Sequence, residues 1–201
     1  MTSSNSDLQL QYSPKAQEII RRTNELLAVG GYNSFSYADI AELVEVRKAS
    51  IHHHFPTKAD LVKATVALHR DAVRRGLQSL DQLTPDPLER LVAYCRFWAE
   101  CIQESNPPIC ICALLAAELP AVPAEVADEV KGHFKDLHAW ITSTMEEGES
   151  RGGMQLADTP SAEASMFMAS IHGAMLAARA AGDALLFWEI AKQSTNRLRM
   201  A

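Results

Sequence analysis

The sequence predicts an all-α fold of about nine helices, with a small N-terminal unit followed by a larger C-terminal one. Three observations support this. Apolar residues recur three or four positions apart through nearly every segment. Proline, glycine and capping residues separate the segments. Helix-forming residues predominate, and 47% of the 201 residues are hydrophobic, which is enough to bury one or two ordinary cores.

The first helix is expected from residue 14 to about residue 29. Ser13 is a capping residue, and Pro14 stands at the first helical position, where the missing N–H of proline costs nothing. Two consecutive glycines, Gly30 and Gly31, end the helix. Residues 1–12 are polar and lack a helical period, so they are expected to form a disordered tail.

Two short helices follow within a predicted DNA-binding domain at residues 13–57. Ser36 caps the first of them. The second must end at Phe55, because a proline at position 56 excludes its predecessor from helical backbone angles. Two short helices joined by about three residues form a helix-turn-helix, the motif that lays its second helix in the major groove of DNA.

The second short helix carries hydrogen-bond donors that suit phosphate oxygens and base edges. Ile51 and Phe55 lie four residues apart and are expected to anchor it to the core, and Ser36 and Lys58 are expected on phosphates. The predicted DNA-contacting residues are Ser36, Arg47, Lys48, Ala49, Ser50, His52, His53 and Lys58.

Residues 31 to 61 read G-Y-N-S-F-S-Y-A-D-I-A-E-L-V-E-V-R-K-A-S-I-H-H-H-F-P-T-K-A-D-L. They combine a glycine-aromatic turn, a serine-capped helix containing Ile-Ala, a turn ending in valine, and a helix running into Phe-x-x-Lys-x-x-Leu. This pattern resembles the DNA-binding half of the TetR family of bacterial transcriptional repressors. The resemblance implies a homodimer that binds an operator through the helix-turn-helix and an effector through its C-terminal domain.

Several positions depart from the family pattern. Glu45 stands where glycine is usual, and a left-handed backbone there would cost a non-glycine residue about 1 kcal/mol. Arg47 replaces a small capping residue, Ala49 replaces a glycine, and histidines stand at positions 52 and 54, where tyrosine is common. These changes bear on which bases are read.

The charge distribution agrees with DNA binding by the first third of the chain. The net charge is −6, yet residues 1–80 hold 10 Lys/Arg against 8 Asp/Glu, whereas residues 81–201 hold 9 against 17. Positive charge is therefore confined to the part that would meet phosphate. No apolar run approaches the ~20 residues of a membrane helix, and the start of the chain lacks signal-peptide order. We expect a bacterial cytoplasmic protein with no membrane partner.

Thr57 and Asp60 form a capping box that opens a long helix, which is expected to connect the two domains over residues 58–82. Residues 83–201 are predicted to form the effector-binding and dimerisation domain. Its helices are expected at about residues 88–104, 109–119, 124–147, 160–181 and 183–198.

The last two helices are predicted to form the dimer interface. The first of the pair has a side of small residues, including Ala169, Gly173 and Ala177, that permits close helix approach, and the second supplies bulk from residues such as Leu185 and Trp188. Packing within one chain is the alternative. The resemblance implies a four-helix bundle between subunits, and two-fold symmetry then predicts a palindromic double-stranded operator.

The C-terminal domain is also expected to bind a small apolar effector, because large or adaptable apolar side chains recur there with histidines nearby. Taken singly, each residue could equally be ordinary core. The candidate ligand-binding residues are Tyr94, Trp98, Cys101, Phe134, Trp140, Met145, Phe167 and His172.

Four cysteines lie close together in the sequence, and they leave two interpretations open. In the first, the cysteines simply pack in the core. In the second, some of them are thiols that sense oxidants or electrophiles, and the candidates are Cys110, Cys112 and Cys101. The function predicted first is therefore a repressor released by an apolar effector, the second is a thiol-sensing regulator, and the third is a helical adaptor that binds protein instead of DNA.

The sequence predicts no metal site, no cofactor and no enzyme. Three consecutive histidines, residues 52–54, cannot converge on one ion, because neighbours on a helix point about 100° apart. No Cys/His spacing resembles a zinc finger, and no nucleotide-binding loop or nucleophile-base pair is indicated.

Overall fold

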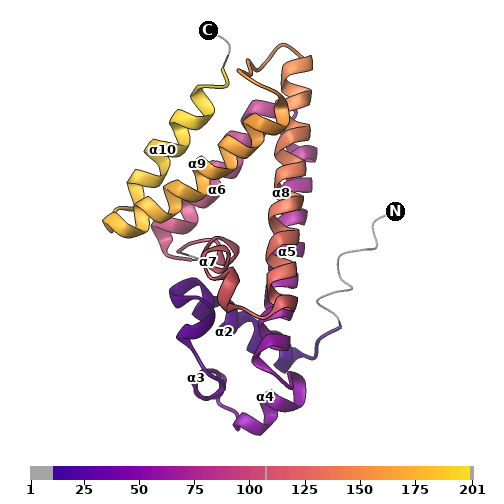
Figure 1. Cartoon of the computed structure of the whole chain (residues 1–201), viewed down its shortest axis with the longest axis vertical. Coiled ribbons are helices and arrows are strands. Elements are labelled where there is room, and N and C mark those ends of the chain that lie inside the picture. The colour runs from indigo at the N-terminus through magenta and orange to yellow at the C-terminus, as the bar shows by residue number, and fades with distance from the viewer. Residues whose placement is uncertain (1–10, 107, 200–201) are drawn as a thin grey trace. The chain divides into compact units, whose positions relative to one another are not determined.

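A computed structural model describes residues 11–106 and 108–199 of the chain. Over these residues the protein is helical, as predicted, and Figure 1 shows the arrangement of the helices. Two short 3₁₀ helices, η1 (Tyr32–Ser34) and η2 (Leu119–Ala121), accompany the α-helices. The α-helices are α2 (Pro14–Gly30), α3 (Tyr37–Leu43), α4 (Lys48–His54), α5 (Lys58–Leu83), α6 (Pro87–Glu104), α7 (Ile111–Ala117), α8 (Ala124–Ser150), α9 (Pro160–Ala181) and α10 (Ala184–Asn196).

Side-chain caps fix the helix starts close to where the sequence places them. Ser13 accepts a hydrogen bond from the backbone N–H of Ala16 at the start of α2. The carboxylate of Asp86 does the same for the first turn of α6, and Asp183 for α10. Most of the expected tail, residues 1–12, lies outside the described residues. No helix in the described ranges combines the length and apolar character needed to cross a membrane.

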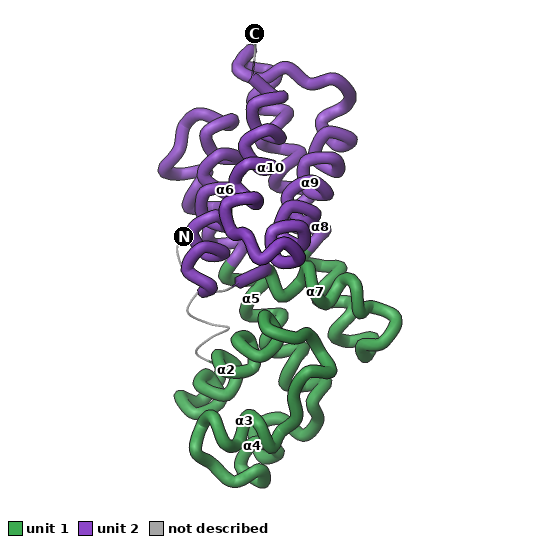
Figure 2. The backbone as a smooth tube through the Cα atoms, turned by 90° about the vertical axis from the view of Figure 1, so that its left-hand side faces the viewer, with its two compact units in different colours: residues 1–72, 110–133 green, residues 73–109, 134–201 purple. Residues whose placement is uncertain are grey.

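The chain divides into two compact units, shown in green and purple in Figure 2. Unit 1 comprises residues 1–72 and 110–133, and unit 2 comprises residues 73–109 and 134–201. This division differs from the sequence-based boundaries, because α7 and the start of α8 belong with the DNA-binding helices. Helices α5 and α8 each contribute to both units.

Unit 1 is organised around the packing of α2, α3 and α4 on one another, and α7 also packs against α2. Its core contains large apolar side chains that are almost completely buried. One comes from each of the three N-terminal helices and one from the start of α5: Leu27, Ile40, Ile51 and Leu61. The recognition-helix candidate α4 is thereby fixed from behind by its own apolar side.

Unit 2 packs α10 against both α9 and α6. Leu91 on α6, Ile141 on α8, Ile171 on α9 and Phe187 on α10 are fully buried. The interior is therefore built from one apolar stripe of each helix. Such helix-on-helix packing derives its stability from buried apolar area rather than from helix propensity.

A partly buried ion pair ties α6 to the end of α8 within unit 2. The Arg90 side chain is only 8% exposed; its Nη1 lies 2.5 Å from Glu147 Oε2, and its Nε donates to the Thr84 carbonyl at 2.7 Å. The hydrogen bond from Arg90, followed by the charges of Arg90 and Arg151, lowers the pKa of Glu147 below its usual value of 4.5.

We therefore expect the Glu147→Gln variant to lose stability mainly above pH 4.5. A carboxyl whose pKa is depressed in the folded state stabilises the protein above its unfolded pKa and loses that effect as the pH falls through the folded value. The difference in unfolding free energy between wild type and Glu147→Gln, measured by urea denaturation, should be largest at pH 7 and shrink toward pH 3. Glu149→Gln, a change at a neighbouring exposed position, is the control. An equal effect of both substitutions would contradict the assignment.

Candidate nucleic-acid interface

Helix α3 begins and ends with recognisable backbone devices. The Ser36 hydroxyl accepts a hydrogen bond from Ala38 N–H, and the Asp39 carboxylate accepts one from Ser36 N–H at 2.6 Å, which completes a capping box. At the other end, Val46 N–H donates to the Ala41 carbonyl and Glu45 N–H to that of Glu42. These two bonds form a Schellman motif around a left-handed residue.

The left-handed residue is Glu45, with φ of 53°. The family pattern usually has glycine at this position, so this backbone conformation carries the steric cost of a non-glycine residue here. A side chain at such a φ places its Cβ close to a neighbouring carbonyl and costs about 1–2 kcal/mol. The tight link between α3 and α4 therefore carries some strain.

We expect the Glu45→Gly variant to raise the free energy of unfolding by about 1 kcal/mol, because glycine adopts this backbone without steric cost. Chemical denaturation measures the change. Glu45→Ala keeps the Cβ and should leave stability nearly unchanged. Glu42→Gly, at an exposed site inside α3, should instead lower stability by about 1 kcal/mol. Destabilisation by Glu45→Gly would show that the turn does not store this strain.

Helix α4 is held in place by its apolar side and by the residue that ends it. Ile51 is completely buried and Phe55 is 4% exposed. The Tyr37 hydroxyl donates to the Phe55 carbonyl at 2.8 Å, and burial, the largest cause, raises the pKa of Tyr37 far above its ordinary value. His52 packs on Tyr37 with ring centroids 4.7 Å apart, and its Nδ1 lies 3.1 Å from the Pro56 carbonyl oxygen. These contacts orient the exposed side of α4.

The predicted DNA-contacting residues of α4 are accessible to solvent. No side chain caps the helix at Arg47, and the Arg47 side chain is exposed. His54 is half-buried, whereas His52 and His53 are exposed. The exposed members of the predicted set are Ser36, Arg47, Lys48, Ala49, His52 and His53, and Ser50 is partly exposed.

Lys58 is only partly exposed and contacts other residues of unit 1 in this structure. Its ammonium donates a hydrogen bond to the Phe35 carbonyl and lies over the rings of Phe35 and Tyr32, 4.1 and 4.8 Å from their centroids. Burial is the largest cause of the lowered pKa of Lys58. The phosphate contact of Lys58 therefore stays a prediction; in this structure its ammonium joins the start of α5 to the segment between α2 and α3.

The candidate effector-binding residues all lie in unit 2. Aromatic contacts pair Tyr94 with Trp140, at 6.1 Å between ring centroids, and Phe134 with His172, at 5.0 Å. The Trp140 indole N–H donates to Asp81 at 2.9 Å. The buried members of the candidate set are Tyr94, Trp98, Cys101, Met145 and Phe167.

All four cysteines are buried and reduced. Burial raises the pKa of Cys95 to about 12 and also raises that of Cys101. The pKa of Cys112 is well above its usual value because of its hydrogen bond with Cys110 and its burial. Thiols of this kind are weak nucleophiles at neutral pH, which disfavours thiol sensing through Cys101 or Cys112.

One cluster of side chains was not predicted from the sequence. His69, Cys110, Cys112 and His133 come together in unit 1, with one ligand-type atom from each lying within 4.8 Å of the others. Cys110 is 41 positions from His69 and 23 from His133, so no spacing motif could reveal the group. The Cys-x-Cys sequence was its only local signal.

The fold and the exposed side of α4 define a helix-turn-helix DNA-binding regulator. Comparison with known proteins identifies the family of regulators. Residues 19–65 match the model of bacterial regulatory proteins of the tetR family, and residues 87–192 match the tetracyclin repressor-like C-terminal domain. The chain belongs to the TetR family of transcriptional regulators, which excludes the adaptor alternative.

Individual relatives agree with this assignment. A TetR-family transcriptional regulator from Agrobacterium tumefaciens is 44% identical, with 96% of this chain and 100% of that chain covered and a TM-score of 0.92. The regulatory protein TetR from Rhodobacter sphaeroides shares the fold at 23% identity, with 92% and 100% covered and a TM-score of 0.85. The nucleoid occlusion factor SlmA of Marinobacter nauticus is 25% identical over 163 residues, which are 81% of this chain and 83% of the relative.

Proposed function

We propose that the protein is a homodimeric repressor that binds a palindromic operator through α4 and leaves it when an effector binds. The observation that carries the DNA-binding part is the set of exposed side chains on α4, a helix anchored to the core by Ile51. There Arg47 and Lys48 supply cations, and Ser50, His52 and His53 supply smaller donors. Cations position a protein on phosphate, while the smaller donors suit base edges.

Fluorescence anisotropy with labelled DNA from both sides of its own gene tests this proposal. A specific site should be bound at least about a thousandfold more tightly than random DNA of equal length. The logarithm of the binding constant should fall linearly with the logarithm of the salt concentration. Equal affinity for all sequences at every salt concentration would contradict sequence-specific binding.

A dimer through α9 and α10 is supported by apolar residues that one chain leaves uncovered. Met166 and Leu176 on α9 are 55% and 45% exposed, and Leu185 on α10 is 64% exposed. Gly173 lies on the exposed side of α9 between the first two, and a Cβ there would have no neighbour within 4 Å. A large apolar surface around a small residue suits a second copy of the same helix pair.

For the effector, we propose an apolar molecule with one hydrogen-bond donor, bound in unit 2. His172 donates from Nδ1 to the Met168 carbonyl at 2.8 Å, which leaves Nε2 as an acceptor. This atom is buried without a hydrogen-bond partner among the described residues, and the ring lies tilted against that of Phe134. A buried, unpaired acceptor is costly unless a ligand satisfies it.

Quenching of intrinsic tryptophan fluorescence by apolar phenols and by the corresponding hydrocarbons tests the effector proposal. Phenols should bind more tightly than hydrocarbons of equal size in the wild type, and this preference should disappear in His172→Phe. Equal binding of both classes by the wild type would remove His172 from the site.

A further inference from the structure

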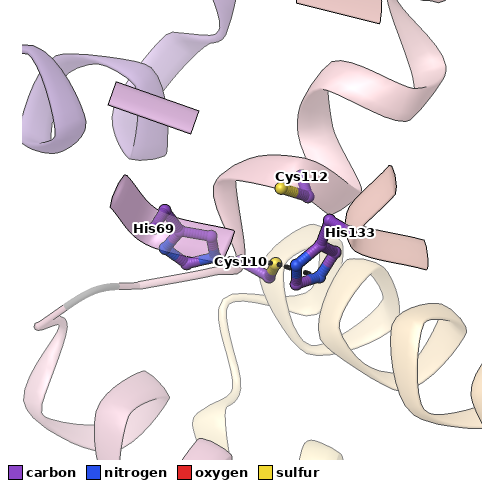
Figure 3. A group of neighbouring side chains, drawn as sticks. All are labelled: His69, Cys110, Cys112 and His133. Carbon is purple, nitrogen blue, oxygen red and sulfur yellow. Dashed lines mark hydrogen bonds between the residues drawn. The ribbon is translucent and has the colours of Figure 1, made fainter. Parts of the chain in front are cut away.

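Three helices of unit 1 bring two thiols and two imidazoles to one point, as Figure 3 shows. His69 comes from α5, Cys110 and Cys112 from the start of α7, and His133 from α8. Cys110 Sγ lies 3.6 Å from His69 Nε2 and 3.9 Å from His133 Nε2. The two imidazole centroids are 5.5 Å apart.

We propose that these four side chains bind a zinc ion. A tetrahedral zinc site has metal–sulfur bonds of about 2.3 Å and metal–nitrogen bonds of about 2.0 Å, so its ligand atoms lie roughly 3.3–3.8 Å from one another. The two sulfur–nitrogen distances above are already near this range, and no pair in the group exceeds 4.8 Å. The side chains need to close in by about an ångström or less. Two cysteines with two histidines are a ligand set typical of zinc.

The backbone at the start of α7 explains how a Cys-x-Cys pair can serve one ion. On a helix, residues two apart point about 200° away from each other. Cys110 precedes the helix with φ −62° and ψ 123°, an extended conformation, and α7 begins only at Ile111. The two thiols can therefore point to the same side, as Figure 3 shows.

Burial and charge also fit a bound ion. Cys110, Cys112 and His133 are buried, whereas His69 is partly exposed and leaves a route for entry. Zinc would be held by two thiolates and two neutral imidazoles, so the filled site carries no net charge and its burial costs little. Binding forms two zinc–sulfur and two zinc–nitrogen bonds and releases the two thiol protons to solvent.

Helix α7 also links this cluster to the DNA-binding helices, all within unit 1. Just after its last residue, the Glu118 carboxylate accepts a hydrogen bond from Tyr32 N–H at 2.7 Å. Gly31, at φ 78°, gives this carboxylate room, because a Cβ there would collide with Glu118 Oε1. Lys58, the first residue of α5 and close behind α4, lies over the Tyr32 ring. A shift of α7 on closing around zinc would therefore be transmitted to the segment that supports α4.

We accordingly propose zinc as an effector that weakens operator binding, a step that rests on the proposed DNA-binding function. Zinc would act inside the DNA-binding unit, and the apolar effector proposed above would act in unit 2. Such coupling requires that zinc bind more tightly when α7 has closed around it than when α7 is in the DNA-binding arrangement.

Metal binding is tested first, on full-length protein without DNA. Competition with a chromogenic chelator should give one Zn²⁺ per chain, and Co²⁺ should produce thiolate-to-cobalt charge-transfer absorption with tetrahedral d–d bands. Cys110→Ser and His69→Gln should each weaken Zn²⁺ binding at least about a hundredfold. Cys95→Ser, which removes a buried thiol outside the cluster, should bind like the wild type. Circular dichroism verifies that each variant folds, and the partly exposed His69 is the site most tolerant of change.

Absence of the cobalt–thiolate band in the wild type overturns the zinc site. Equal Zn²⁺ affinity in wild type, Cys110→Ser and His69→Gln would do the same.

The coupling between zinc binding and operator binding is tested next with operator DNA. One equivalent of Zn²⁺ should weaken the wild type at least tenfold and leave His69→Gln unchanged. Unchanged operator affinity in a zinc-loaded wild type overturns the regulatory step. Failure of the zinc-free protein to bind any operator instead refutes the proposed DNA-binding function. The metal titration contains no DNA, so its result does not depend on that function.

Discussion

Replacement of Arg47 and Lys48 by glutamate is expected to abolish operator binding, weakening it by about a hundredfold or more near 0.1 M salt. Both side chains are exposed at the start of α4, and neither contributes to the core of unit 1. In a dimer the double substitution reverses four charges that would face phosphate. The folded state should be unaffected, because nothing buried is changed.

Anisotropy titrations over a range of salt concentrations measure this effect and separate its causes. The milder Lys48→Ala removes one cation from the phosphate backbone, so it should lower the salt slope by about 1 and weaken binding to all sequences alike. His53→Ala should instead reduce operator affinity while leaving random DNA nearly unaffected, if His53 reads a base.

Lys135→Glu on α8 is the control, since it reverses an exposed cation in unit 2 on a helix outside the proposed dimer interface. It should bind the operator like the wild type apart from a small long-range effect of charge. Full operator affinity in the Arg47→Glu/Lys48→Glu protein would remove α4 from the interface.

The Leu176→Arg substitution is expected to convert the dimer to a monomer. Leu176 is 45% exposed on α9, on the same side as Gly173. Two copies of this position would meet near the proposed two-fold axis, where a guanidinium without a partner would be buried. Sedimentation velocity should then report the single-chain mass of 22.1 kDa in place of twice that value.

Loss of the dimer should also weaken operator binding by about a hundredfold or more, because a monomer engages one half-site without the effective concentration supplied by its partner. Affinity for an isolated half-site should be unchanged, which separates this effect from damage to α4. Leu83→Arg, at an apolar residue that is 80% exposed at the end of α5, should remain dimeric. A monomeric wild type, or a dimeric Leu176→Arg protein, would rule out the proposed interface.

The helix-turn-helix could be predicted from the sequence because its determinants are local. Capping boxes, a proline after Phe55 and four-residue apolar spacing each act within one or two turns of helix. The sequence-based helix limits consequently agree with the structure to within a few residues. The left-handed backbone at Glu45 was decided by the structure, because the sequence indicated only what such a conformation would cost.

The role of Lys58 could not be predicted in the same way. Its position in the first turn of a helix suggested a phosphate contact, but its partner is the Phe35 carbonyl, 23 residues earlier. Whether a lysine reaches outward or inward depends on the groups that the fold brings beside it. The aromatic pair of Phe134 and His172 likewise depends on the packing of α8 against α9.

The sequence by itself determined the helices, their ends, the helix-turn-helix and the confinement of positive charge to the first third of the chain, because each follows from neighbouring residues or from composition. Only the tertiary structure decided that His69, Cys110, Cys112 and His133 converge. The metal site was absent from the sequence-based prediction for that reason: its four ligands come from three helices, and ligand geometry depends on distances in space that helix packing alone sets.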